Sequence, residues 1–456
     1  MKHHLYRLFH SLGGTPWVYD TVSARLIRLE GLPKEVLAEQ VEAYLLRQNL
    51  IRSLPKSNGV AQKVSEEEYL SLLDGYASRL TLELTQQCNL RCSYCVYSGK
   101  FSGRRTHSTR QMSLDTALGA IELFRCLSHR MRHVSICFYG GEALLCFDTI
   151  QKLVPLTRDR LSKRVIFHIS TNGTLLDDAF FQWMRKNPDV FLDVTLNGLE
   201  HDRYRRYIDG SPTLADILRN IRHLRKRYPD MAESRLNFIC NAGNNRELES
   251  LWKFYEAFGA TPALITGIEF PEDRTLLTTP EDTEIWKTLA WHYIRKDDAF
   301  LRCFFEPGLL RIHHRRAMPD ETRTILEGTC LPLLSNLFVN AAGEITLCEK
   351  VCGPLLGSVS EGLNQPDILK LMRHYVKALD KRCDDCWAQR LCAVCYRDLN
   401  PSGGIHPDIC AAVRKDLTRE LSLYASVCEE VPERLRHYDE MMPVLENLDA
   451  WNSEFD

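Results

Sequence analysis

Strand-like and helix-like segments alternate regularly from residue 79 onward, and this rhythm constrains the fold more than any other feature. The apolar, strand-like runs lie at 80–84, 134–139, 165–170, 190–196, 236–240 and 263–270. Helical patterns separate them at 114–127, 148–161, 178–185, 214–228 and 246–258. Strands that alternate with helices are typical of parallel sheets, because each helix carries the chain back across the sheet. We predict an α/β fold with a parallel sheet, either a barrel or a doubly wound sheet.

A cysteine-rich loop directly follows the first of these strands. Cys88, Cys92 and Cys95 have the spacing Cys-x3-Cys-x2-Cys. Three nearby thiolates can bind three irons of a [4Fe–4S] cluster, because such clusters are held by cysteine, and the fourth iron is then open. The loop also lies at the carboxyl end of a strand, where α/β folds place their sites. A zinc site completed by a distant ligand is the alternative.

Composition favours metal ligands over disulfides for these cysteines. The 456-residue chain has 17 cysteines, but its N-terminus lacks an apolar signal-peptide core and no run of 18 apolar residues occurs. We therefore expect a cytoplasmic protein that does not span a membrane, in which disulfides are rare. Lys and Arg number 58 against 60 Asp and Glu, so no overall basic charge indicates nucleic-acid binding.

Motifs at four successive strand ends resemble those of the radical S-adenosylmethionine (SAM) enzymes. The cysteine loop, with Tyr94 before its last cysteine, is similar to the cluster motif of that family. The next strand ends are similar to the family's Gly-Gly-Glu, Thr-Asn-Gly and Ser-x-Asp-Gly segments; they read Gly140-Gly141-Glu142, Thr171-Asn172-Gly173 and Thr195-Leu196-Asn197-Gly198. Asn197 stands where relatives usually have Asp. Four such motifs in order make coincidence a poor explanation.

The resemblance implies a partial (β/α)6 TIM-like barrel with SAM bound to the open iron of the cluster. One electron from the cluster would cleave SAM to a 5′-deoxyadenosyl radical, which abstracts a hydrogen atom from the substrate. The resemblance further implies that SAM contacts come from Tyr94, Gly140, Gly141, Glu142, Ser170, Asn172, Thr195 and Arg205.

A second group of cysteines resembles the SPASM extension, which holds two auxiliary [4Fe–4S] clusters in peptide-modifying relatives and would bring the total to three clusters. By position, the outer cluster would be held by Cys383, Cys386, Cys392 and Cys410. The inner cluster would be held by Cys330, Cys348 and Cys395, and either Cys352 supplies the fourth ligand or an open iron binds a substrate thiolate. The spacing before Cys395 is one residue shorter than in relatives. Two Cys-x2-Cys pairs also resemble a zinc ribbon, but five residues between the pairs is tighter than usual.

An acidic residue near the inner cluster is thought to take a proton in sulfatase-maturing relatives, so we hypothesise that Glu349 is a catalytic base; a solvated turn residue is the alternative. The basic run at 311–316 is either a solvated face or a contact for an acidic peptide or a flavodoxin- or ferredoxin-type electron donor.

The first 77 residues or so predict three short strands, at 5–10, 15–19 and 24–29, followed by helices at 32–50 and 66–77 and a loop at 53–65 between them. They resemble the winged-helix domains (RRE-like) that bind precursor peptides by adding the leader segment to a sheet edge. A DNA-binding winged helix is the alternative, but the helix at 32–50 has few basic residues.

These features together predict a radical SAM/SPASM oxidoreductase that matures a ribosomally synthesised peptide by forming a thioether or C–C crosslink. The predicted domains are an RRE-like domain (1–77), a radical SAM core (78–300), a bridging helical region (301–329), a SPASM domain (330–420) and a helical tail (421–456). Formylglycine formation, as in anaerobic sulfatase maturation, is the alternative enzyme function. A zinc-binding interaction or regulatory protein is the alternative of another class.

Overall fold

The computed structural model describes residues 5–29, 38–51, 65–101, 105–268, 280–317, 332–383, 385–398, 404–405 and 407–446. Contacts divide the chain into two compact units. Unit 1 comprises Met1–Ser65, Thr279–Cys330 and Met372–Asp456, and unit 2 comprises Glu66–Thr278 and Leu331–Leu371.

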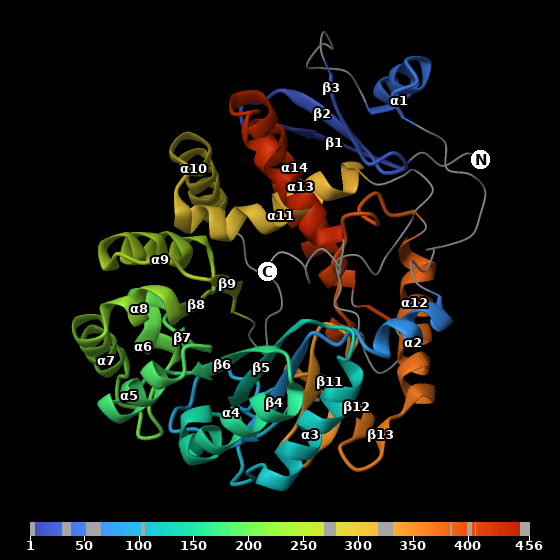
Figure 1. Ribbon diagram of the computed structural model, residues 1–456. Helices are drawn as coiled ribbons and strands as arrows, with labels where there is room; N and C mark the ends of the chain where they lie inside the picture. Colours follow the sequence, from blue (N-terminus) through green and yellow to red (C-terminus); the bar gives the residue numbers. More distant parts are fainter. Residues whose placement is uncertain are drawn as a thin grey trace. The chain divides into compact units, whose positions relative to one another are not determined.

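Unit 2 contains the predicted parallel strands in sequence order, which confirms the α/β barrel-type fold (Figure 1). These strands are β4 (Arg79–Thr85), β5 (His133–Gly140), β6 (Arg164–Thr171), β7 (Val190–Thr195), β8 (Leu236–Ala242) and β9 (Leu264–Gly267). Each pairs in parallel with the next. Their carboxyl ends therefore lie along one edge, where the four motifs meet.

Four further strands extend this sheet beyond β4 and were not predicted. β10 (Leu337–Val339) pairs in parallel with β4. β11 (Glu344–Cys348), β12 (Val351–Ser358) and β13 (Gly362–Leu363) then follow as antiparallel neighbours. The hairpin of β11 and β12 brings Cys348 and Glu349 beside the barrel.

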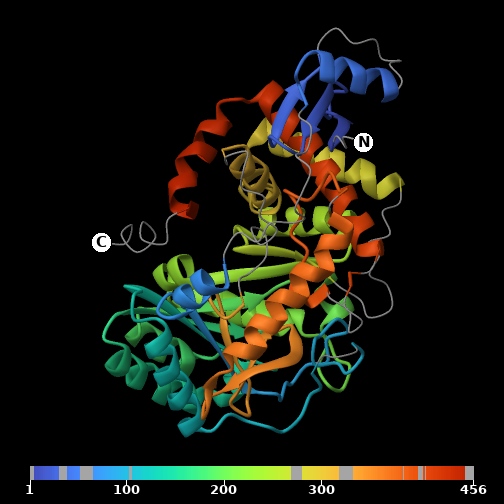
Figure 2. The ribbon, with the colours of Figure 1, turned by 90° about the vertical axis from the view of Figure 1, so that its right-hand side faces the viewer.

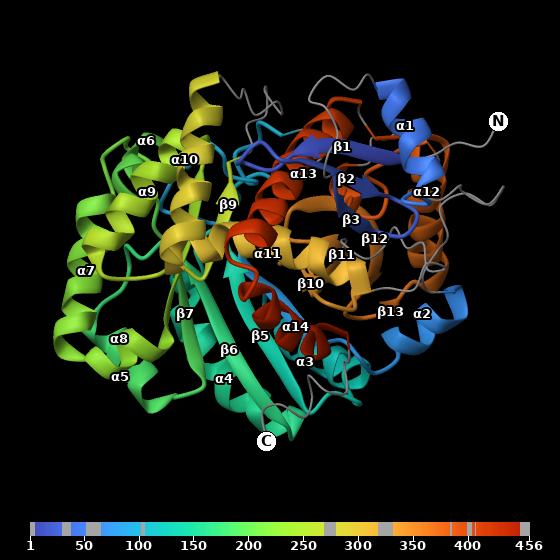
Figure 3. The same cartoon turned by 90° about the horizontal axis from the view of Figure 1, so that it is seen from above.

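Helices follow the parallel strands at the predicted places, and Figure 3 shows them beside the sheet. They are α3 (Leu114–Leu127), α4 (Phe147–Leu161), α5 (Asp178–Lys186), α7 (Leu214–Arg227) and α9 (Asn245–Phe258). Three begin at side-chain caps, because Ser113, Asp177 and Asn244 each accept a hydrogen bond from a backbone N–H in the first turn. Unit 2 also contains the shorter helices α2 (Glu66–Leu73), α6 (His201–Tyr204) and α8 (Pro229–Arg235).

The two faces of the parallel sheet differ in polarity. Val134, Ile136 and Phe138 of β5 are buried, whereas the alternating positions are partly exposed. The same alternation holds in β6, β7 and β8. We call the partly exposed side the inner face; its polar residues include Ser135, Cys137, Tyr139, His168, Ser170, Asp193, Thr195, Asn237 and Asn241.

Unit 1 contains the predicted N-terminal strands as an antiparallel sheet of β1 (Tyr6–His10), β2 (Pro16–Asp20) and β3 (Arg25–Arg28). α1 (Ala38–Arg47) lies within the helix predicted at 32–50 and ends three residues earlier; the start of that helix, at 32–37, and most of the predicted loop at 53–65 lie outside the described residues. Val18, Leu29, Leu45 and Ile51 form the core between sheet and helix.

The remaining helices are α10 (Pro280–Lys296), α11 (Ala299–Ala317), α12 (Gln365–Cys383), α13 (Pro407–Glu430) and α14 (Arg434–Glu446). The basic run in α11 is not a solvated face, because Arg311 pairs with Glu420 of α13 at 2.5 Å and His313 and Arg315 are buried. Figure 2 shows α13 passing beside the N-terminal sheet, which it contacts at β1. The described helices include none that is both long and apolar enough to cross a bilayer.

Candidate iron–sulfur and SAM site

The three predicted cluster cysteines lie close together on the loop after β4. Cys95 N donates to Cys92 O at 3.2 Å, and the sulfurs of Cys88 and Cys95 accept hydrogen bonds from Leu90 N and Tyr97 N. Burial raises the pKa of the Cys88 thiol to about 12 and that of Cys95 to about 11, and neighbouring thiols reinforce both shifts. Iron would displace these protons on binding, as metals do at cysteine sites.

Gly140 and Gly141 let the end of β5 pass very close to this loop. A Cβ atom at Gly140 would lie 2.2 Å from Thr85 O, and one at Gly141 would lie 2.2 Å from Gln87 O. Gly140 also has φ of +148°, a region that side chains rarely adopt. Two backbone hydrogen bonds close the contact, from Gly141 N to Thr85 O and from Glu142 N to Gln87 O, each 2.8 Å. The strand end and the loop therefore form one cradle.

Glu142 and Asn172, which were predicted to contact SAM, form hydrogen bonds with other residues of the chain. The buried Glu142 carboxylate accepts from Leu144 N, Thr171 Oγ1 and Asn172 N at 2.7–3.0 Å. Asn172 Nδ2 donates to Asn89 Oδ1 at 2.8 Å and lies 3.9 Å from Cys88 Sγ. These side chains fix the ends of β5 and β6 against the cluster loop, which leaves little of either for a ligand.

Tyr94 and Arg205 form the opposite wall of the site. The Tyr94 hydroxyl accepts from Arg205 NH1 at 3.0 Å and from Asn197 Nδ2 at 3.1 Å. Arg205 is buried, and its charge interacts with the thiols of Cys92 and Cys88. Within the described residues, Arg205 Nε and Ser93 Oγ are buried without a hydrogen-bond partner. Buried polar atoms are normally satisfied, so this wall fits a polar ligand such as SAM. Ser170 and Thr195 complete the predicted set from the inner face, at the ends of β6 and β7.

Unit 1 holds a cavity of about 300 Å³ lined by all four predicted outer-cluster cysteines, Cys383, Cys386, Cys392 and Cys410. Ala378, Leu379, Ile405 and Val413 supply apolar walls. Burial raises the pKa of the Cys392 thiol to about 11, with contributions from Cys386 and Cys410. Four cysteine sulfurs around a mostly apolar, partly open pocket match the ligand set of a [4Fe–4S] cluster.

The predicted inner-cluster ligands are distributed over both units. Cys348 ends β11 in unit 2, Cys395 lies in unit 1 and Cys330 lies outside the described residues. Cys352 lies in β12. This ligand set therefore stays a prediction.

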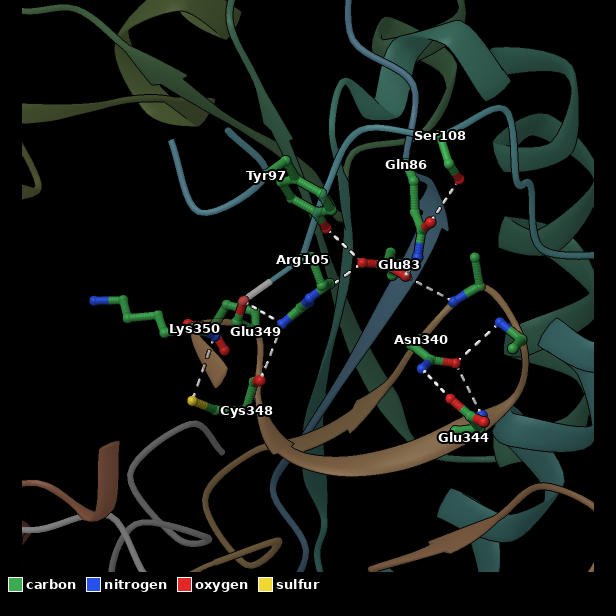
Figure 4. Close-up of polar contacts among 12 residues, drawn as sticks. Glu83, Gln86, Tyr97, Arg105, Ser108, Asn340, Glu344, Cys348, Glu349 and Lys350 are labelled. Carbon is green, nitrogen blue, oxygen red and sulfur yellow. Dashed lines mark hydrogen bonds and ion pairs between the residues drawn. The ribbon is translucent and has the colours of Figure 1, made fainter. Parts of the chain in front are cut away.

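A buried ion pair fixes the turn that carries Cys348 and Glu349 (Figure 4). Arg105 NH1 lies 3.2 Å from Glu83 Oε1, and their side chains are 9% and 0% exposed. Arg105 also donates to the backbone oxygens of Cys348 and Glu349. The Glu83 carboxylate further accepts from Tyr97 OH at 2.5 Å and from Ala341 N at 2.9 Å. The cluster loop and the β11–β12 turn are thus joined through one charged network, and Asn336 Nδ2 holds the Glu349 carboxylate at 3.1 Å.

Among the described residues, no three Cys, His, Asp or Glu side chains converge on one point as the ligands of a single metal ion do. A four-iron cluster needs no such convergence, because each thiolate binds its own iron.

Sequence reasoning missed several residues that the structure places in these sites. Asn241 Nδ2 approaches the Tyr94 hydroxyl at 3.4 Å. Glu83 and Arg105 form the network just described. On the inner face, His168 Nδ1 and Asp193 Oδ2 lie 3.0 Å apart. The signal for this last pair was the alternation of polar residues inside β6 and β7.

A parallel barrel with a cysteine loop after its first strand and a glycine cradle after its second defines an iron–sulfur enzyme that binds a cofactor at its strand ends. The family model described as the radical SAM superfamily matches residues 82–252. An uncharacterised protein of Methanocaldococcus jannaschii is 30% identical over 293 residues, which cover 64% of this chain and 91% of that protein. The chain belongs to the radical SAM superfamily, whose enzymes use a [4Fe–4S] cluster and SAM.

Sulfatase-maturating enzymes are also similar. A cysteine-type anaerobic sulfatase-maturating enzyme of Clostridium novyi is 24% identical over 184 residues, or 39% of this chain and 48% of that enzyme. The match thus spans about half the length of this relative. The solved structure of anSMEcpe with bound AdoMet and Cp18Cys peptide has a TM-score of 0.59 at 17% identity and covers 80% of this chain and 99% of that one. This likeness supports the fold.

Proposed function

We propose that this chain is a radical SAM/SPASM maturase that forms an intrapeptide thioether or C–C crosslink in a ribosomally synthesised precursor. The cavity lined by four cysteines carries this proposal, because four sulfurs around one pocket support a second cluster in a radical SAM chain. In this proposal SAM and the cluster at Cys88, Cys92 and Cys95 supply the hydrogen-abstracting radical. The chain's own residues hold the cofactor, exclude water and orient the peptide.

Two auxiliary clusters complete the proposed cofactor set, with Cys330, Cys348, Cys395 and either Cys352 or a substrate thiolate on the inner one. An open inner cluster favours thioether formation and a closed one favours C–C coupling. The five predicted domains, a flavodoxin- or ferredoxin-type donor and a cytoplasmic location belong to the same proposal.

The leader of the precursor is proposed to pair with β3. The sheet order is β1-β2-β3, so within the described residues β3 has a paired strand on one side only. Leu29 N donates to Pro16 O of β2 at 3.0 Å. Because successive N–H groups of a strand point to opposite sides, the N–H of Leu26, three residues before Leu29, faces the open edge. An added strand would bind that group, as in other edge-strand recognition.

Leu26→Pro tests this edge directly. Proline removes the outward N–H but leaves the bonds to β2, and Leu26→Ala is the matched control that keeps the N–H. Loss of one backbone hydrogen bond of about 1 kcal/mol should weaken leader binding about fivefold. Fluorescence anisotropy of a labelled leader peptide measures it. Equal binding by the two variants would argue against the edge.

The chemistry is tested with reconstituted enzyme, SAM, reductant and a short peptide encoded beside this gene. A crosslink removes two hydrogens from the peptide, and tandem mass spectrometry locates it. The same preparation should contain about twelve irons per chain, from three four-iron clusters. If deoxyadenosine forms while the peptide stays unchanged, this peptide is not the substrate, but the radical chemistry stands.

Formylglycine formation remains a second candidate function, favoured by the similarity to sulfatase-maturating enzymes. A cysteine converted to formylglycine loses its sulfur, so the mass change separates the two functions. Membership in the radical SAM superfamily argues against the third interpretation, a zinc-binding regulatory protein.

A further inference from the structure

The inner face of the barrel carries an imidazole–carboxylate pair that the proposed cofactor sites do not use. His168 of β6 places Nδ1 3.0 Å from Asp193 Oδ2 of β7. Asn237 Nδ2 of β8 donates to the other oxygen, Oδ1, at 2.8 Å. The His168 ring stacks on Phe191 with centroids 5.7 Å apart. Three neighbouring strands thus fix both the carboxylate and the plane of the ring.

The hydrogen bonding defines which ring nitrogen is available. Burial alone would raise the pKa of Asp193, but the hydrogen bonds from His168 and Asn237 and the charge of Arg79 hold it below its usual value. The carboxylate is therefore ionised and accepts a hydrogen bond from Nδ1 of His168. The second ring nitrogen, Nε2, is not engaged by Asp193.

The imidazole is accessible from the inner face. Its side chain is 21% exposed and that of Asp193 is 19% exposed. Within the part of the chain that the structure describes, the contact with Asp193 is the only hydrogen bond of this ring. An imidazole whose Nδ1 is hydrogen-bonded to a carboxylate and whose Nε2 is open has the arrangement of a general base held by an orienting acid.

Other titratable groups surround the pair on the same face. Cys137 of β5 is the register neighbour of His168, and its raised pKa reflects burial and the nearby charges of Asp193 and Glu349, opposed by Arg79 of β4. The carboxylates of Asp193 and Glu349 are therefore both close enough to this thiol to act on its pKa. Ser170, a predicted SAM contact, lies two residues beyond His168 on the same face, or about 7 Å along the strand. His168 therefore lies one layer of side chains below Ser170 on the inner face.

We propose that His168, oriented by Asp193, accepts the proton of a thiol or hydroxyl group of the substrate. This inference rests on the proposed function and narrows its substrate class. It implies that a Cys, Ser or Thr side chain takes part in the reaction, which suits thioether or formylglycine formation better than coupling of two carbon atoms.

The proton step balances without any oxidant. The S–H or O–H bond breaks, its electron pair stays on sulfur or oxygen, and the proton forms an Nε2–H bond. The resulting imidazolium is stabilised by the carboxylate of Asp193. An imidazole is a stronger base than an ordinary carboxylate, which favours His168 over Glu349 for this proton.

The first test needs no substrate. Diethyl pyrocarbonate acylates unprotonated imidazole nitrogens, and peptide mass mapping identifies the modified histidines. His223 is the matched control, because it also pairs with a carboxylate, Asp178 at 3.3 Å, and is 49% exposed. We expect both histidines to react in the reconstituted full chain. If His223 is modified and His168 is not, the proposal is overturned, whether or not the chain is a peptide maturase.

The second test separates proton transfer from hydrogen abstraction. Removing a general base typically costs about 100-fold or more, so His168→Gln should lose product at least that strongly while deoxyadenosine release and iron content persist. Asp193→Asn should reduce product formation less than His168→Gln does and should alter the pH profile of product formation. Asp193→Glu should restore most of the product. Product retained by His168→Gln but lost by Glu349→Gln would refute the assignment. A wild-type enzyme that modifies no peptide would refute the proposed function and leave the acylation result standing.

Discussion

Replacing Arg105 by Met should destabilise unit 2 by about 3–5 kcal/mol, the cost of breaking one partner of a buried ion pair. The structure supports a value in this range because the Glu83 side chain is fully buried and would lose its only ion-pair partner among the described residues. Three hydrogen bonds to Glu83 remain, from Tyr97 OH, Gln86 Nε2 and Ala341 N. They solvate the carboxylate partly and place the expected cost near the lower end, about 3 kcal/mol.

Differential scanning calorimetry measures this loss as a fall of roughly 6–12 °C in the unfolding transition of unit 2. The matched variants are Glu83→Gln and the double variant. Because the double variant leaves no unpaired buried charge, it should be more stable than the sum of the single changes predicts. A single-variant effect below about 1 kcal/mol, as exposed ion pairs give, would refute the interpretation that the pair is shielded from water.

Further outcomes follow from the other sites. Gly141→Ala places a methyl group 2.2 Å from Gln87 O and should reduce SAM cleavage about 100-fold, the effect of a displacement near 1 Å, measured as deoxyadenosine release. Cys386→Ala should remove about four irons per chain from the outer site without abolishing SAM cleavage, as iron analysis and the same assay would show. Asp193 has a lowered pKa in the folded chain, so its contribution to stability is present above its ordinary value and lost as pH falls through the folded value. Urea midpoints should therefore decline below pH 4 more steeply in the wild type than in Asp193→Asn.

The barrel was predictable because local patterns and tertiary packing agree there. The helix predicted at 114–127 is α3, and each predicted strand lies within a residue or two of an observed one, apart from the shorter β9. Apolar side chains at every second position of β5 to β8 face the helices, so periodicity and burial carry the same information. The cysteine loop and the glycine cradle were equally visible, because their chemistry depends on residue type and spacing.

The parts that escaped prediction depend on distant partners. β10 is only three residues long and becomes a strand by pairing with β4, more than 250 residues earlier in the chain. Arg105 looks like an ordinary surface residue until Glu83 and the carbonyl oxygens of the β11–β12 turn surround it. The basic run of α11 was expected to be a solvated face or a partner contact, yet Arg311 pairs with α13 and His313 is buried between Tyr424 and Asp439. Local pattern cannot report which charges will find such partners.

The N-terminal sheet and the outer cysteine loop are not independent parts of unit 1. Thr21 Oγ1 donates to Trp387 O at 2.7 Å, and Arg390 NH1 donates to Val22 O at 2.5 Å. Both loop residues lie between Cys386 and Cys392, which line the proposed cluster cavity. The β2–β3 turn is therefore bonded to the segment that shapes this cavity. Because β3 continues from that turn to the proposed leader-binding edge, displacement of the edge would be transmitted to the loop through two hydrogen bonds. A leader that binds β3 would thus stabilise the same segment that holds the outer cluster.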